Sequence, residues 1–398
     1  MKLKTLDNLE LEGKTVILRC DLNVPLDNNG KVTDITKIKR HKATIDELIN
    51  KKAKILVISH LGRPKGKEIK KLSLNNISDA FVKVMKIKEI TVLPYCRPQV
   101  IDSVLKDKKA GSITLMENIR FYPEEEENNL NFAKELANIA DYFVNDAFSV
   151  AHRSHASVTG LTDYVPSFSG RSLEKEVITI GKFLSSKNKR KIAIIGGSKI
   201  STKINLINNL LKNVNAIVIG GAMANTFLLA QGRKIGKSLN EKSMVKIAKK
   251  IISNASKNKC KIILPVDAIV ASNLREGGEF SEYSIENIPN DGLILDIGKK
   301  SIAIIDKEIS KTKEVLWCGP LGLFEQSPFH VGTASVAKTL SKMTKNGKII
   351  SVAGGGDTVA AISQSNYVND FTYISTAGGA FLEMIAGQKL PGIEALRK

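Results

Sequence analysis

The chain has 398 residues, of which 42% are hydrophobic and 25% are charged, and its formal net charge is +20. This length exceeds what one hydrophobic core usually organises, so two domains are expected. No segment approaches the roughly 18 uncharged apolar residues of a membrane span, and the N-terminus shows no apolar signal region, so a cytoplasmic protein without a membrane partner is expected.

Five apolar runs in the first part of the chain predict strands, and stretches of helical periodicity separate them. The predicted strands are Val16 to Cys20, Ile55 to Ser59, Ile90 to Leu93, Ile113 to Met116 and Tyr142 to Asn145. This alternation is typical of a parallel sheet with helices on both faces. The first part therefore has enough strands for one doubly wound α/β domain.

Charged or polar side chains follow these strands, at the edge where an open parallel sheet binds its ligands. They are Asp21 and Asn23 after the first run, His60 and Arg63 after the second, Arg120 after the fourth, and Arg153 in the segment after the fifth. Guanidinium groups bind phosphate and carboxylate bidentately, and the carboxylate and amide would hold a hydroxyl. The first part is predicted to bind a small anion with more than one charge.

A helix is predicted from Leu173 to Leu184, because apolar positions recur there every three or four residues. It lies between the two sets of strands and would join two domains. The expected limits are 1–170 for the first domain, 171–184 for the joining helix, and residue 185 for the start of the second domain.

The second part repeats the alternation of apolar runs and helical stretches. Its predicted strands are Ile192 to Ile195, Ala216 to Ile219, Ile262 to Pro265, Val315 to Trp317, Ile349 to Ala353 and Tyr373 to Ser375. These six strands are enough for a second doubly wound parallel sheet.

Glycine-rich turns follow three of these strands, and backbone N–H groups at a helix start suit a polyphosphate. In the first turn, Gly196 to Lys203, the two lysines Lys199 and Lys203 are four residues apart and are expected on one helical face as point charges. In the last turn, Thr376 to Ala380, the amides of Gly378 and Gly379 are expected at a helix N-terminus.

The turn Gly354-Gly355-Gly356-Asp357-Thr358 is the strongest nucleotide signal, because it joins a strand to a helix and carries a carboxylate. Asp357 is expected where a Mg²⁺ ion on a phosphate would sit. Glu325, after Gly322-Leu323-Phe324, is placed to hydrogen-bond a ribose. The second part is therefore predicted to bind a nucleotide with Mg²⁺.

The high positive charge raises nucleic-acid binding as another interpretation. The lysines are scattered over stretches with helical apolar spacing, such as Lys246 to Lys250, and aromatic residues suited to base stacking are not interleaved with them. That pattern favours solvated helix faces. No nucleic-acid partner is expected.

Taken in order, these motifs resemble those of the phosphoglycerate kinase family over nearly the whole chain. They are Arg19 to Pro25, His60-Leu61-Gly62-Arg63-Pro64, Val144 to Phe148, Gly196 to Lys199, Gly319 to Glu325, Gly354 to Thr358 and Leu390-Pro391-Gly392. The resemblance implies a cytoplasmic monomer of two Rossmann-like domains that closes about a hinge. It also implies that the second domain ends at residue 384 and that 385–398 return to the first domain.

The resemblance assigns roles to residues of both domains. It implies that Asp21, Asn23, Lys37, His60, Arg63, Arg120 and Arg153 bind 3-phosphoglycerate. It implies that Gly197, Lys199, Lys203, Gly221, Glu325, Gly355, Gly356, Asp357 and Thr358 bind the Mg-nucleotide, with Asp357 on the metal side. The small-molecule partners would be 3-phosphoglycerate, 1,3-bisphosphoglycerate, ATP and ADP.

Three positions depart from the family pattern. Lys37 stands where the family has a catalytically important Arg, Cys318 replaces an Asn that contacts the nucleotide phosphates, and Ala377 replaces the first glycine of the last turn. Lys keeps the charge but cannot form the planar bidentate fork of Arg. The Ala is a small change only if its φ is negative.

The expected reaction is a reversible, direct in-line phosphoryl transfer after domain closure, because no base-activated Ser or Cys is evident for a covalent intermediate. The charge stabilisers are expected to be Lys37, Lys199 and the amides of Gly378 and Gly379. Two alternatives stay open. One is a dinucleotide-binding dehydrogenase, although this chain has no Gly-x-Gly-x-x-Gly run after the first strand of either half. The other is a basic binding protein that has lost activity.

Overall fold

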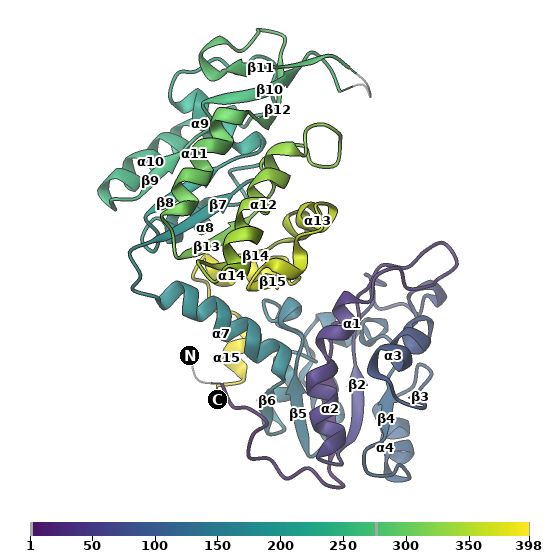
Figure 1. The fold of residues 1–398 in the computed structure, drawn as a ribbon. Helices are drawn as coiled ribbons and strands as arrows, with labels where there is room; N and C mark the ends of the chain where they lie inside the picture. The colour runs from purple at the N-terminus through teal and green to yellow at the C-terminus, as the bar shows by residue number, and fades with distance from the viewer. Residues whose placement is uncertain (1–2, 275–277, 398) are drawn as a thin grey trace. The chain divides into compact units, whose positions relative to one another are not determined.

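The computed structural model describes residues 3–274 and 278–397, and they form two compact units (Figure 1). The first unit comprises residues 1–179 and 389–398, and the second unit comprises residues 180–388. The predicted domain limits at 170, 184 and 384 stay a prediction. Each unit is described by itself below.

The first unit contains a six-stranded parallel sheet. Its strand order is β3 (Thr91–Val92), β4 (Ile113–Leu115), β2 (Lys54–Ile58), β1 (Thr15–Arg19), β5 (Tyr142–Asn145) and β6 (Ser167–Ser169). The sequence did not predict β6, because its segment Ser-Phe-Ser has one apolar residue and is recruited by backbone pairing with β5. The predicted parallel sheet is confirmed with this sixth strand added.

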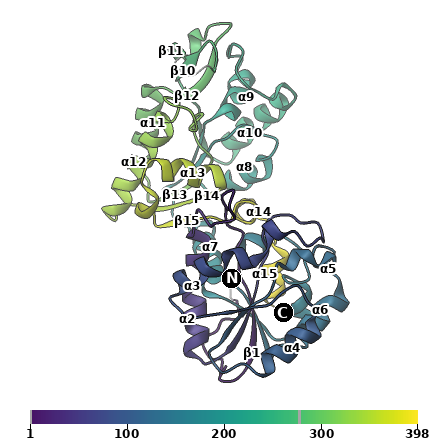
Figure 2. The ribbon, with the colours of Figure 1, turned by 90° about the vertical axis from the view of Figure 1, so that its right-hand side faces the viewer.

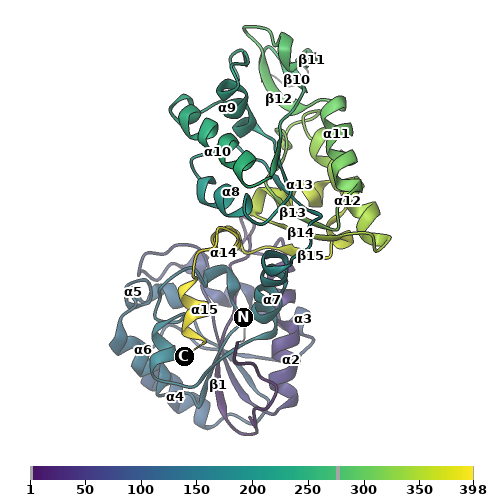
Figure 3. The same ribbon diagram turned by 90° about the vertical axis from the view of Figure 1, so that its left-hand side faces the viewer.

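Helices cover both faces of this sheet (Figure 3). One face packs on α1 (Thr36–Arg40), α2 (Lys42–Asn50) and α3 (Ser78–Met85), and the other on α4 (Pro98–Lys106), α5 (Pro123–Glu126) and α6 (Leu130–Ala137). Successive residues of a strand point to opposite faces of the sheet. Val16 and Leu18 therefore pack in the core on the face of α1 to α3, and Ile17 packs in the core on the other face. Short 3-10 helices are η1 (Lys70–Leu72), η2 (Leu74–Ile77), η3 (Ile119–Phe121), η4 (Phe148–Val150) and η5 (Gly160–Asp163).

The second unit has its own six-stranded parallel sheet (Figure 2). Its order is β15 (Tyr373–Ser375), β14 (Ile350–Gly354), β13 (Glu314–Cys318), β7 (Lys191–Ile195), β8 (Ala216–Ile219) and β9 (Lys261–Ile263). The surrounding helices are α8 (Ile204–Leu210), α9 (Ala222–Ala230), α10 (Val245–Lys257), α11 (Lys299–Ser310), α12 (Val331–Lys345), α13 (Gly356–Gln364) and α14 (Gly379–Ile385), with η6 (Lys242–Met244), η7 (Ile285–Asn287) and η8 (Val368–Asp370). Trp317 of β13 is fully buried in the core between this sheet and α11 and α12.

A small antiparallel sheet in the second unit was not predicted from the sequence. Its order is β11 (Phe280–Ser284), β10 (Asp267–Ala271) and β12 (Leu293–Ile297). Residues of β11 are mostly exposed, so they form no apolar run, and the strand depends on pairing with β10. Hydrophobic patterning detects strands buried on both faces and misses strands like this one.

Two segments pass between the units along the chain. Helix α7 (Arg171–Ser185) begins in the first unit and ends in the second, which confirms the predicted helix. The C-terminal helix α15 (Pro391–Ala395) belongs to the first unit, where the N–H of Gly392 donates to the carbonyl of Ala151 at 2.8 Å. The expected return of the C-terminal segment is therefore confirmed. No helix within the described ranges combines the length and apolarity that crossing a membrane requires.

Candidate active site

In the first unit, the predicted anion-binding residues gather at the carboxyl edge of the sheet. Because β1, β2 and β4 are neighbours in one parallel sheet, the loops that follow them meet there. The group is called the cationic cluster below and consists of Lys37, His60, Arg63, Arg120 and Arg153 around Asp21.

Asp21 is the buried acceptor of the cationic cluster. Its Oδ2 lies 2.9 Å from Nζ of Lys37 on α1 and accepts a hydrogen bond from the hydroxyl of Ser149 at 2.6 Å. Burial acts to raise the pKa of this carboxyl, but the charge of Lys37 and the hydrogen bonds from Ser149 and Lys37 outweigh burial and hold the pKa well below its usual range. Asp21 is therefore a carboxylate at neutral pH and fixes Lys37 at the edge of the cluster.

Asn23 joins two loops of the site. Its backbone N–H donates to Oδ1 of Asp21 at 3.0 Å, and its side-chain carbonyl accepts from the N–H of Gly62 at 2.9 Å. The side-chain amide of Asn23, which is predicted from the sequence to bind a hydroxyl of the ligand, thus also fixes the position of the loop after β2.

Arg120, in η3, is the most enclosed guanidinium of the predicted set. It is 8% exposed, donates to the carbonyl of Gly62 at 2.8 Å and lies 3.3 Å from Glu126. Burial lowers its pKa, and the charges of Arg63 and Arg153 add to that effect, so the three guanidiniums are close enough to repel. Arg63 and Arg153 are exposed. A bound polyanion would relieve this repulsion.

Sequence reasoning assigned no role to three polar residues that support the cluster. Arg19 donates to His60, Ser149 donates to Asp21, and His41 accepts the backbone N–H of Asp21 at 2.9 Å while its Nδ1 lies 2.7 Å from Oδ2 of Asp146. Two of these had a signal: Arg19 ends the same strand run that leads to Asp21, and His41 lies one helical turn after Lys37.

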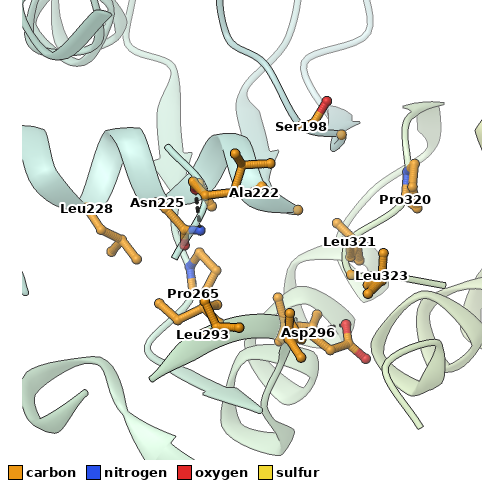
Figure 4. Close-up of a pocket in the computed structure, with 18 of the residues that line it drawn as sticks. Ser198, Ala222, Asn225, Leu228, Pro265, Leu293, Asp296, Pro320, Leu321 and Leu323 are labelled. Carbon is orange, nitrogen blue, oxygen red and sulfur yellow. Dashed lines mark hydrogen bonds between the residues drawn. The ribbon is translucent and has the colours of Figure 1, made fainter. Parts of the chain in front are cut away.

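In the second unit, a cavity of about 310 Å³ lies at the carboxyl edge of the sheet (Figure 4). Of the predicted nucleotide residues, its lining includes Gly197, Gly221, Glu325 and Asp357. Apolar side chains supply much of the rest, among them Leu228, Pro265, Leu293, Leu321 and Leu323. This cavity, called the glycine-rich pocket, suits a flat apolar ring with a polar tail. Lys199, Lys203, Gly355, Gly356 and Thr358 lie outside the described lining.

Close crossing of three loops explains the glycines at the mouth of this pocket. The N–H of Gly197 donates to Pro320 at 3.1 Å, and the N–H of Gly221 donates to Leu321 at 2.9 Å. Gly221 has φ 64°, and a Cβ there would come within 2.7 Å of the backbone nitrogen of Gly197. Only glycine allows the loops to approach this closely.

The two lysines do not lie on a helical face as predicted. Helix α8 begins at Ile204, so Lys199 and Lys203 both fall in the turn before it. Nζ of Lys203 donates to the carbonyl of Gly196 and lies 3.4 Å from the carbonyl of Cys318. The four-residue spacing of the two lysines predicted a helix. Instead, this segment is a turn that packs against the loop at Gly196, and the helix begins only at Ile204.

Helix α13 begins directly after the glycine turn, with Gly355 at φ 98° before it. The buried Thr358 accepts the backbone N–H of Gly319 at 2.6 Å, so its hydroxyl fixes a neighbouring loop. Asp357 is exposed and lines the pocket.

The residues present fit a Mg²⁺ ion carried by a nucleotide. Groups of three or more His, Cys, Asp or Glu side chains suited to hold a metal are absent from the described residues. Mg²⁺ at phosphate sites is usually held by one or two carboxylates together with phosphate oxygens and water. A single carboxylate at Asp357, beside the pocket, meets that requirement.

Two departures from the family pattern have a visible structural setting. Ala377 does not have a positive φ, and its N–H donates to Ser375 at 3.2 Å, so alanine is tolerated before Gly378, which has φ 49° at the N-terminus of α14. Burial raises the pKa of the Cys318 thiol. The backbone carbonyl of Cys318 accepts the N–H of Gly196 at 3.0 Å, an interaction that any residue could make.

Comparison with known proteins adds an independent finding. The family described as phosphoglycerate kinase matches residues 6–388. Phosphoglycerate kinase of Bradyrhizobium diazoefficiens is 48% identical over 396 residues, covering 100% of this chain and 99% of the relative, and that of Bartonella quintana is 45% identical over 398 residues, covering 100% of both.

Solved structures agree with these sequence matches. The structure of phosphoglycerate kinase from Coxiella burnetii has a TM-score of 0.91 and 38% identity, covering 100% of this chain and 99% of that one. The enzyme from Pyrococcus horikoshii has a TM-score of 0.84 and 29% identity, covering 99% and 98%.

Proposed function

The chain belongs to the phosphoglycerate kinase family and is a phosphotransferase of that kind, and we propose that it transfers a phosphoryl group reversibly between 1,3-bisphosphoglycerate and Mg-ADP. The products are 3-phosphoglycerate and Mg-ATP. The observation that carries the proposal is the chemistry of the two sites: the first unit holds a cationic cluster, and the second unit holds an apolar pocket edged by glycine loops and a carboxylate.

The cationic cluster is proposed to bind 3-phosphoglycerate. Arg63, Arg120 and Arg153 grip the phosphate and carboxylate groups as forks, while Lys37 and His60 add a point charge and a ring N–H. The substrate hydroxyl faces Asp21 and Asn23. The mutual closeness of the guanidiniums supports this assignment, since an anion between them removes their repulsion.

The glycine-rich pocket is proposed to bind the nucleotide. The loops of Gly197, Gly221, Gly355 and Gly356 approach the phosphates with bare backbone, Lys199 and Lys203 supply charge, and Glu325 binds the ribose. Thr358 contributes at the phosphates and holds the Gly319 loop. Asp357 would hold the Mg²⁺ that accompanies the nucleotide, and the ion would supply positive charge to the phosphates.

The proposed mechanism is direct in-line transfer with no covalent enzyme intermediate. Catalysis then consists of positioning and of stabilising charge on the phosphoryl group in flight. We assign that stabilisation to Lys37, Lys199 and the amides of Gly378 and Gly379 at the start of α14. The two units close on the ligands and exclude water, which would otherwise hydrolyse the acyl phosphate. We further propose a cytoplasmic monomer.

A coupled assay tests this proposal. Mg-ATP and 3-phosphoglycerate are supplied, and the acyl phosphate formed is reduced by an NADH-consuming dehydrogenase. Turnover that requires both substrates is expected and would show that Lys37 suffices in place of Arg. If both ligands bind but no turnover is seen, the proposed activity is wrong and the chain is an inactive binding protein.

The alternative functions have their own readouts. Family membership decides against the dehydrogenase, and stabilisation of the fold by Mg-ADP but not by NADH is the expected result. Nucleic-acid affinity that falls steeply with salt would instead support a basic binding protein.

A further inference from the structure

A chain of buried polar contacts reaches His60 from the side opposite to solvent. Nε of Arg19 donates to the hydroxyl of Ser157 at 2.9 Å, and that hydroxyl donates to Oε1 of Glu125 at 2.6 Å. The NH2 group of Arg19 lies 3.1 Å from Nδ1 of His60. Arg19, Ser157 and Glu125 are fully buried, and His60 is 4% exposed.

The contact between Arg19 and His60 fixes which ring nitrogen carries the proton. A guanidinium has only donors and does not lose its proton in proteins, so Nδ1 of His60 must accept. The neutral ring then carries its proton on Nε2. This Nε2–H makes no hydrogen bond among the described residues, which leaves it for a ligand.

The surrounding charges also keep the ring neutral. Burial lowers the pKa of His60 well below its usual range, and the neighbouring charges of Arg19, Arg120 and Lys37 lower it further, while Asp21 acts in the opposite direction. A protonated ring would place a hydrogen on Nδ1 against the N–H of Arg19. Electrostatics and hydrogen-bond geometry therefore favour the same state.

The carboxylate of Glu125 compensates the positive charge of the buried Arg19 guanidinium. Both carboxylate oxygens are held by Ser157, one by its hydroxyl and the other by its backbone N–H at 2.8 Å. Burial acts to raise the pKa of Glu125, but the His155 ring, whose Nδ1 lies 3.7 Å away, the charge of Arg19 and the hydrogen bonds from Ser157 outweigh it and lower the pKa. The Glu125 carboxylate thus balances Arg19 through Ser157 and fixes the direction of the guanidinium.

We propose that Arg19, oriented by Ser157 and Glu125, is a positioning residue that fixes His60 as the neutral Nε2–H tautomer. The substrate site then offers the anion an N–H donor that does not change with pH over the working range. The identity of the anion as 3-phosphoglycerate rests on the proposed function, but the tautomer does not.

NMR of the full chain labelled with ¹⁵N-histidine tests the tautomer directly. The chain has five histidines, and loss of one signal set in His60→Gln assigns His60. We expect the neutral Nε2–H pattern from about pH 5.5 to 8.5, since an unperturbed ring titrates near 6.5. An Nδ1–H pattern, or a titration near pH 6.5, would overturn the proposal. Because this measurement needs no turnover, its failure is separate from failure of the kinase assay.

Arg19→Lys removes the planar fork while keeping the charge. In this variant we expect a mixed tautomer, because the donor that faces Nδ1 of His60 is no longer fixed by Ser157, and a higher KM for 3-phosphoglycerate with the KM for ATP unchanged. A folded Arg19→Lys variant whose His60 keeps the pattern of the unsubstituted chain would show that Arg19 is only structural.

Ser157→Ala covers the case in which Arg19→Lys does not fold. It leaves both charges and removes only the link between them, so we expect a mixed His60 tautomer and a rise in KM for 3-phosphoglycerate of about threefold to tenfold, as for loss of one hydrogen bond. Ser167→Ala is the matched control, because this buried serine of the same unit donates only to Val165 in the described contacts. If Ser157→Ala leaves the tautomer unchanged, the positioning role is refuted.

Discussion

Among the residues that the structure describes, Nζ of Lys37 pairs with the carboxylate of Asp21 at 2.9 Å, and the Lys37 side chain is 27% exposed. The nearby Arg40 is instead paired with Glu176 of α7 at 3.2 Å. In the proposed mechanism, Lys37 is therefore the residue of this helix that stabilises charge on the transferred phosphoryl group.

Lys37→Met is expected to reduce kcat/KM about 10- to 150-fold, since a charge-assisted hydrogen bond contributes about 1.5–3 kcal/mol. Lys37→Arg should match or exceed the unsubstituted enzyme, because the fork adds a second contact. Steady-state kinetics measure both, with Lys39→Met on the exposed face of the same helix as the control. Equal activity of Lys37→Met and the control would contradict the assigned role.

The hydroxyl of Thr358 connects α13 to the Gly319 loop by accepting the N–H of Gly319. Thr358→Val removes the acceptor of a buried N–H, so we expect a loss of about 1–3 kcal/mol of stability and a higher KM for ATP. Thr358→Ser keeps the hydroxyl and should retain both properties. Thermal unfolding and ATP kinetics distinguish them, and identical Val and Ser variants would exclude a role for the hydroxyl.

Among the elements of the second unit, the antiparallel sheet is joined to α12 through Asp296. This residue of β12 is 2% exposed and accepts the N–H of Gly332 on α12 at 2.6 Å and its neighbour Ile297 at 2.9 Å. Burial raises the pKa of Asp296 to about 7, against the lowering effect of the two N–H groups. A carboxyl that also lines the glycine-rich pocket thus couples a strand, a helix and the ligand site.

The raised pKa predicts how stability depends on pH. In the unfolded chain this carboxyl titrates near 3.9, so between about pH 4 and 7 the folded state binds a proton that the unfolded state does not. The free energy of unfolding should therefore fall as the pH rises through this window, by up to about 4 kcal/mol, and level off above pH 7.

Asp296→Asn cannot titrate and should lack this component of the slope. Urea unfolding at pH 4.5 to 8 measures it, followed by the fluorescence of Trp317, the one tryptophan of the chain, in the core of the second unit. Parallel curves for the two proteins across pH would refute the assignment.

The first unit contains the C-terminal segment of the chain as well as its N-terminal part. Ile393 and Leu396 are 3% and 0% exposed, and Gly392 packs so closely on Ala151 that a Cβ there would come within 3.1 Å of its Cα. The first unit is therefore complete only after the whole second unit has been synthesised.

Leu396→Ala is expected to destabilise the first unit by about 2–5 kcal/mol, as large-to-small core substitutions do. Hydrogen exchange of β1 and β5 should accelerate, while Trp317 fluorescence reports a smaller change in the second unit. The control is Arg397→Ala, whose partner Glu394 is partly exposed, so it should change little. Equal effects on both units would show that they unfold as one.

Domain closure is the remaining expectation at this scale. Small-angle scattering with 3-phosphoglycerate and a Mg-nucleotide together should give a smaller radius of gyration than the ligand-free protein, because two ligands held by different units must meet for transfer. Either ligand alone is the control. Unchanged dimensions with both ligands would count against closure.

Most of the parallel strands, and the loops that follow them, were predictable from local patterns of residues. Runs such as Val16 to Leu18 and Ile192 to Ile195 are apolar on both faces, and a strand buried on both faces needs that pattern. Polar residues directly after such runs were predicted to meet, and the structure brings Asp21, His60 and Arg120 together at one edge. The ligands assigned to them stay a prediction.

Features that depend on partners distant in the chain were not predictable from local patterns and follow from how the chain folds. Strands β6 and β11 depend on backbone pairing rather than on apolar runs of their own, and the turn at Lys203 lies where loops cross at Gly196. The role of Arg19 depends on Ser157, which is 138 residues away in the chain. Local patterning reports burial along a segment, but hydrogen-bond partners are set by which segments the fold places side by side.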